Sequence, residues 1–145
     1  MDDEPSFPRL RQVVLDSVDA RTLAEFYRQL LGFAYRPGDE PPSAGQPDVS
    51  GQDWLVLRHP NDGMQLAFQQ VAELPEATWP EGEHPQMLHL DLTVPNVAAL
   101  DDQHARALAL GARLLSDRSD DPEEPLYVYA DPAGHPFCIF VAPEN

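Results

Sequence analysis

The sequence repeats one strand-and-helix pattern, with the second copy 77 residues after the first. Each copy is a strand-like segment, residues 12–19 and 89–96, followed by apolar residues at helical spacing. The same offset separates Asp19 from Asn96, and a turn glycine recurs 71 residues later, at Gly63 and Gly134. The change of offset falls in loops, where insertions are tolerated. The duplication predicts two similar modules that share one cleft.

In the first module, apolar residues alternate along residues 10–18, as in a strand with one covered face. Asp19 is a suitable N-cap for the helix that the apolar stripe between Leu23 and Leu31 predicts, and Gly32 suits its C-terminal end. A loop rich in proline and glycine is expected at residues 37–51. Further strands are expected at residues 33–36, 54–58 and 64–70.

The second module repeats this order, with a strand at residues 87–94 and a helix between Asn96 and Gly111. Its apolar helical stripe is Val97, Leu100, His104, Ala107 and Leu108. Three more strands are expected at residues 112–115, 126–130 and 137–141. The sequence therefore predicts one α+β domain over residues 1–145. Two β-α-β-β-β modules, at about 9–70 and 87–142, are joined by a linker at 71–86, and their curled mixed sheet surrounds a shared cleft.

The composition excludes several kinds of partner. The formal net charge is −16 and all nine basic residues are arginine, so nucleic acids and anionic membranes would be repelled. The single cysteine, Cys138, excludes an internal disulfide. No apolar segment resembles a signal peptide or reaches membrane-spanning length. We expect a cytoplasmic protein whose partner is a small molecule.

The strand face away from the helices is the candidate functional surface. In the first strands of the two modules, this face carries polar side chains such as Gln12, Asp16, His89 and Asp91. Such a face is open to water or lines a cleft. His89 and Asp91 are the candidate catalytic residues, although strand geometry separates them by about 7 Å. The expected cleft residues are Gln12, Trp54, Gln65, Gln69, His89, Asp91, Tyr127 and Tyr129. The aromatic residues among them have core packing as an alternative role.

These segments resemble the vicinal oxygen chelate superfamily, and within it the glyoxalase-like and bleomycin resistance protein-like domains. The resemblance covers about residues 9–142. It rests on the duplication, on His89-Leu90-Asp91-Leu92, on Leu110-Gly111-Ala112 and on the segment Asp131-Pro132-Ala133-Gly134-His135-Pro136-Phe137. The superfamily includes lyases, epimerases, dioxygenases, fosfomycin-modifying enzymes and metal-free antibiotic-binding proteins. The resemblance also implies a homodimer.

In metal-binding members of the superfamily, the ligands come from the first and last strand of each module. The resemblance places these positions at Gln12, Ala67, His89 and Cys138. Ala67 has no donor atom, and a thiol is an unusual ligand for a site built from hard ligands. Both expected carboxylates are missing. We therefore expect no family-type metal site and no cofactor.

Three functions remain open from the sequence. The first is a metal-independent protein that binds a small molecule in the cleft. The second is a metal-dependent lyase, isomerase or dioxygenase that uses Gln12 and His89 with a non-standard ligand, Asp91 or Cys138. The third is an interaction module whose cleft is filled by its own side chains.

Overall fold

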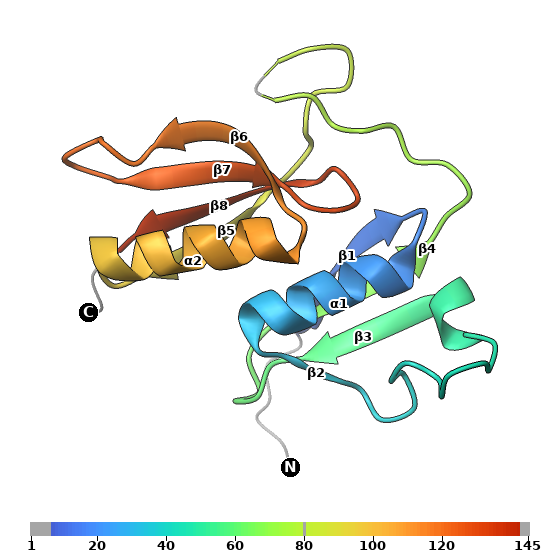
Figure 1. The fold of residues 1–145 in the computed structure, drawn as a ribbon. Coiled ribbons are helices and arrows are strands. Elements are labelled where there is room, and N and C mark those ends of the chain that lie inside the picture. The colour runs from blue at the N-terminus through green and yellow to red at the C-terminus, as the bar shows by residue number, and fades with distance from the viewer. Residues whose placement is uncertain (1–6, 80, 143–145) are drawn as a thin grey trace.

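The computed structural model describes residues 7–79 and 81–142, and its elements follow the predicted order (Figure 1). The first module consists of β1 (Gln12–Ser17), α1 (Ala20–Leu31), β2 (Ala34–Tyr35), the short 3₁₀ helix η1 (Ser50–Gln52), β3 (Trp54–Arg58) and β4 (Gln65–Gln70). The second consists of β5 (Leu90–Val94), α2 (Val97–Leu110), β6 (Arg113–Arg118), β7 (Leu126–Ala130) and β8 (Pro136–Val141).

The two modules build sheets of the same topology. The strand order is β1-β4-β3-β2 in the first sheet and β5-β8-β7-β6 in the second. In each sheet the first strand runs parallel to the last, and the remaining pairs are antiparallel. The predicted duplication and the α+β class are therefore confirmed. The two mixed sheets remain separate and do not close into one.

The helix ends lie where the sequence predicts them. The side chain of Asp19 accepts a hydrogen bond from the backbone N–H of Thr22, and Asn96 accepts one from Ala99 in the same way. Gly32 and Gly111 end the helices in left-handed backbone conformations, with φ of 72° and 119°. A side chain at either position would strain the backbone, so glycine is the natural residue there.

Two strand boundaries differ from the predicted ones by three residues, and the other boundaries by two residues at most. The ladder between β5 and β8 starts where Leu90 pairs with Phe137, so residues 87–89 precede the strand although their polarity alternates. Met87 has no strand partner and is 99% exposed. β6 extends to Arg118, three residues beyond the predicted end, because it pairs with β7 along its length around an irregularity between Leu114 and Ser116.

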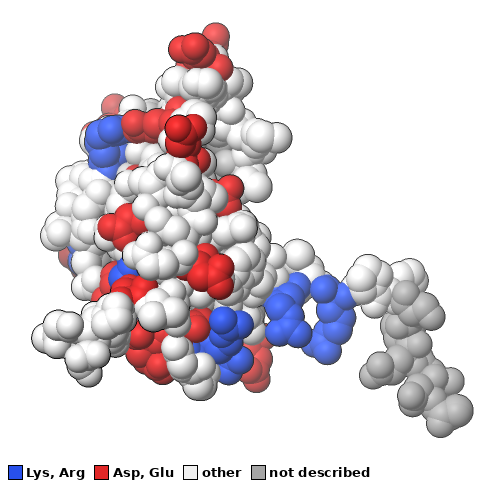
Figure 2. Space-filling view, turned by 90° about the vertical axis from the view of Figure 1, so that its right-hand side faces the viewer, with Lys and Arg blue, Asp and Glu red and all other residues white. Residues whose placement is uncertain are grey.

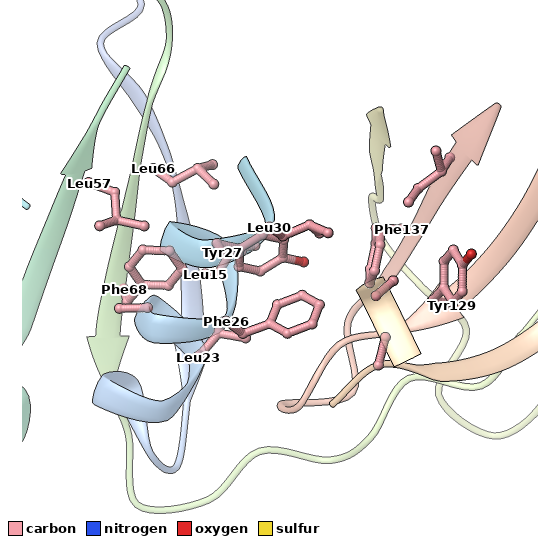
Figure 3. Close-up of a cluster of buried hydrophobic side chains, with 14 of the residues drawn as sticks. Leu15, Leu23, Phe26, Tyr27, Leu30, Leu57, Leu66, Phe68, Tyr129 and Phe137 are labelled. Atoms are coloured by element: carbon pink, nitrogen blue, oxygen red, sulfur yellow. The ribbon is translucent and has the colours of Figure 1, made fainter. Parts of the chain in front are cut away.

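Helix α1 packs against both modules and joins them into one hydrophobic core. Figure 3 shows its Phe26, Tyr27 and Leu30 between the first sheet and Phe137 of the second. The Phe26 and Tyr27 rings each contact the Phe137 ring, with centroids 5.7 and 6.0 Å apart. By contrast, Val97 and Leu108 of α2 are exposed, so the predicted apolar stripe of that helix is buried only in part.

Two polar contacts also connect the modules. The Tyr27 hydroxyl donates a hydrogen bond of 2.7 Å to the buried carboxylate of Asp131. The ring Nε2 of His135 lies 2.7 Å from the backbone oxygen of Asp16. Both partners in the second module belong to the turn between β7 and β8. This turn therefore fixes one end of the central strands β7 and β8 against β1 and α1.

The surface is predominantly acidic. Figure 2 shows acidic side chains spread over the face that it views, with arginines mainly at the lower right and a separate group at the upper left. This distribution agrees with the formal net charge of −16. Neither helix in the described part of the chain combines the length and the apolar character that crossing a membrane requires.

Candidate functional site

In the first module, four of the expected cleft residues share the sheet face that points away from α1. Strand register pairs Gln12 with Gln65 and Trp54 with Gln69, which places each pair on one side of the sheet. The intervening residues, such as Leu66, point into the core. This open face thus presents three amide groups and an indole, which offer hydrogen bonds and stacking and carry no charge.

In the second module, His89, Asp91 and Cys138 lie together on the corresponding face. The ring Nε2 of His89 is 3.1 Å from a carboxylate oxygen of Asp91, and β-sheet register places Cys138 beside Asp91. The potential ligand atoms of the three residues all lie within 4.8 Å of one another. His89 precedes β5, so the separation of about 7 Å expected for a regular strand does not apply to its ring.

Neighbouring side chains fix the orientation of this cluster. The Nδ1 of His89 lies 3.0 Å from the amide oxygen of Gln86, and the edge-on ring of Trp79 lies 5.7 Å from the imidazole. Cys138 is buried, with 7% of its surface exposed. Burial, with a further contribution from the charge of Asp91, raises the pKa of the Cys138 thiol to about 11. The thiol is therefore protonated at neutral pH unless a cation binds it.

Tyr127 and Tyr129, expected in the cleft with core packing as the alternative, are buried in the hydrophobic core. Strand register pairs them with Ile139 and Phe137, which point into the core beneath α2. The His104 ring stacks on Tyr127 with centroids 3.9 Å apart, and its Nδ1 lies 2.7 Å from the Tyr129 hydroxyl. These contacts also half-bury His104. Its side chain therefore lies on the inward-facing stripe of α2, as its spacing from the apolar residues of that helix predicts.

The residues at the four family-equivalent positions do not fit the family's metal site. Ala67 is fully buried on the open face of the first sheet, where register places it between Val14 and Val56. None of these three side chains has a donor atom. Of the two first-module positions, only Gln12 offers a ligand, and that ligand is neutral. A divalent cation held at the four family-equivalent positions would therefore receive no negative charge from the two in the first module.

A cavity of about 540 Å³ lies between β1, the linker and the start of β8. Its apolar walls include Val14, Leu74, Pro85, Met87, Leu88 and Pro136. Its polar residues include Asp16, Glu83, His84, Gln86 and His135. Sequence reasoning missed most of this lining, because the linker has no periodic pattern that would assign its side chains to a face. Val14 and Asp16 of β1 are exceptions, since alternation places both on the open face.

The paired modules and their uncovered faces define a vicinal oxygen chelate fold. A family model described as a glyoxalase-like domain matches residues 12–140, which is most of the chain. The protein therefore belongs to the glyoxalase-like domain family, as the resemblance in the sequence indicates.

Solved structures with the same fold come from proteins of differing activity. A glyoxalase/dioxygenase from Nostoc punctiforme superposes with a TM-score of 0.68 at 17% identity, covering 99% of this chain and 100% of that one. A fosfomycin resistance protein from Mesorhizobium loti gives 0.61 at 13%, covering 98% and 94%. A lactoylglutathione lyase from Agrobacterium tumefaciens gives 0.57 at 18%, covering 95% of each chain. No curated protein matches this sequence.

Proposed function

We propose that this protein binds a small molecule and lacks the four-ligand metal site of its superfamily. The observation that carries the proposal is Ala67, a fully buried residue without a donor at a position where the family site requires a ligand. The cavity beside β1 supports it, because 540 Å³ lies within the usual range of about 300–1,000 Å³ for ligand pockets. Its mostly apolar walls favour a ligand with a substantial apolar part.

The metal-dependent alternative with Gln12 and His89 as ligands receives less support. Such a site needs anionic ligands to offset the charge of the cation, and the first module supplies none at the equivalent positions. In glyoxalase-type chemistry a carboxylate at the metal also acts as the base, and neither Ala67 nor Cys138 is a carboxylate. The cavity likewise argues against an interaction module with a filled cleft.

The test uses Nile red, a neutral apolar dye that becomes fluorescent in apolar surroundings. We expect saturable binding of one dye per chain, unchanged by a chelator. Val14→Trp places a large ring in the cavity and should weaken binding by at least about tenfold, equivalent to about 1.4 kcal/mol. The matched control is Val97→Trp, at an exposed position of α2 outside the cavity. Equal binding by both variants, or no saturable binding, would refute the proposal.

We also propose that the protein acts as a homodimer in the cytoplasm. The family resemblance supports this proposal, and so do the exposed apolar side chains of Met87 and Leu88 at the mouth of the cavity. Sedimentation equilibrium should give twice the chain mass of 16.1 kDa. A mass of one chain across micromolar concentrations would contradict the dimer without affecting the binding proposal.

A further inference from the structure

We propose that His89, Asp91 and Cys138 form a binding site for a divalent cation of borderline softness, best suited to Zn²⁺. The three residues come from the position just before β5, from β5 and from β8, so the second module builds the site alone. The site shares His89 and Cys138 with the family-equivalent positions, but Asp91 takes the place of the two ligands that the family draws from the first module. It also stands whether or not a small molecule binds in the cavity.

The donor chemistry selects the cation. Imidazole nitrogen, carboxylate oxygen and thiolate sulfur are the three ligand types that Zn²⁺ accepts in proteins. Mg²⁺ and Ca²⁺ prefer oxygen ligands and do not favour a thiolate. With a neutral imidazole, the carboxylate of Asp91 and the thiolate of Cys138 supply two negative charges, which offset the charge of the cation. The two family-equivalent positions of the first module, Gln12 and Ala67, supply no negative charge.

The contact with Gln86 prepares His89 for this role. Nδ1 of His89 lies 3.0 Å from the amide oxygen of Gln86, a contact that fixes the rotation of the ring. Nε2 of the same ring lies 3.1 Å from a carboxylate oxygen of Asp91, so the imidazole is oriented with Nε2 directed at the other two ligands. An oriented imidazole with a hydrogen-bonded second nitrogen is the usual arrangement around bound metal.

Cation binding displaces one proton from the site. The Cys138 thiol loses its proton to solvent as its sulfur bonds to the metal: Cys–SH + M²⁺ gives Cys–S–M⁺ + H⁺. Three protein ligands leave the fourth tetrahedral position free for water or another small ligand. Gln86 also lines the cavity beside β1, so the site borders the cavity. A bound cation would thus lie next to the space in which the small molecule is proposed to bind.

Co²⁺ titration of the full chain tests the site, because Co²⁺ replaces Zn²⁺ and a cobalt–thiolate bond gives a charge-transfer absorption in the near ultraviolet. We expect one Co²⁺ per chain with this band, and displacement by Zn²⁺ but not by Mg²⁺. Cys138→Ser should abolish the band. Asp91→Asn should keep the band but weaken binding by at least about tenfold, as should Gln86→Leu through loss of ring orientation.

The controls separate this site from the acidic surface. Asp101→Asn removes an exposed carboxylate on α2 and should leave both affinity and spectrum unchanged. Cobalt binding without the thiolate band, or Zn²⁺ affinity equal in the wild type and Cys138→Ser, would overturn the proposal. Failure to bind either ion would overturn it as well. Nile red binding is measured in a separate experiment. A failure of the cation site can therefore be distinguished from a failure of the cavity proposal.

Discussion

At the scale of single residues, the buried contact between Tyr27 and Asp131 is the most informative polar pair. Tyr27→Phe removes the hydroxyl that donates to the buried carboxylate and should lower the free energy of unfolding by about 1–3 kcal/mol. Tyr35→Phe is the matched control, since its hydroxyl bonds to Glu25 in a partly exposed position where water replaces it. Urea denaturation measures both losses. Equal losses would contradict a special role for the contact between the modules.

The same carboxyl group predicts a pH dependence of stability. Burial raises the pKa of Asp131 above its ordinary value, against the opposing effect of the Tyr27 hydrogen bond. Between the ordinary Asp pKa of about 3.9 and the raised folded-state value, the folded protein holds a proton that the unfolded chain has lost. The contribution of Asp131 to stability is therefore present at low pH and is lost as the pH rises through this window.

Asp131→Asn isolates this contribution because the amide does not titrate. The stability of the wild type relative to this variant should be greater at about pH 4 than at about pH 7. Urea denaturation at both values checks the sign. A relative stability that is flat, or that rises with pH, would show that the Asp131 pKa is not raised.

At the scale of elements, the two helix caps allow a direct comparison of the modules. Asp19→Ala removes bonds to the backbone N–H and the hydroxyl of Thr22, and Asn96→Ala removes one to Ala99. Each should cost about 0.5–2 kcal/mol, with the larger loss for Asp19. Thermal and urea denaturation provide the measurement. Asp102→Ala, at an exposed position inside α2, should change stability little, and a loss as large as that of the cap variants would contradict the capping role.

Alternation and capping signals predicted which segments form helices and strands. They could not predict, for every strand, which of its two faces is buried in the core. The strand pattern of β7 places Tyr127 and Tyr129 on one side, yet alternation alone does not say which side α2 covers. Their true side follows from pairing with Phe137 and Ile139, a contact between distant segments. Similarly, Asp91 reaches His89 because β5 starts at Leu90, a boundary set by pairing with β8. The linker residues that line the cavity show no periodic pattern in the sequence, so their facing could not be predicted.

At the scale of the whole molecule, the duplicated sequence produces two sheets but one core. Rings of α1 lie against Phe137, which belongs to the last strand of the other module (Figure 3). Neither module can bury these rings without the other. The duplication therefore describes how the fold is built, whereas the packing of α1 determines how it unfolds. We expect the two modules to unfold as one cooperative unit.

Phe137→Ala tests this cooperativity. Removing a fully buried ring should cost about 3–5 kcal/mol, because it creates a cavity where the core of the two modules meets. Amide hydrogen exchange under native conditions should show the same loss of protection in β3 and β4 of the first module as in β7 and β8 of the second. Leu108→Ala, at an exposed position of α2, should change neither region. Loss of protection confined to the second module would mean that α1 does not couple the two, and that each sheet is stabilised within its own module.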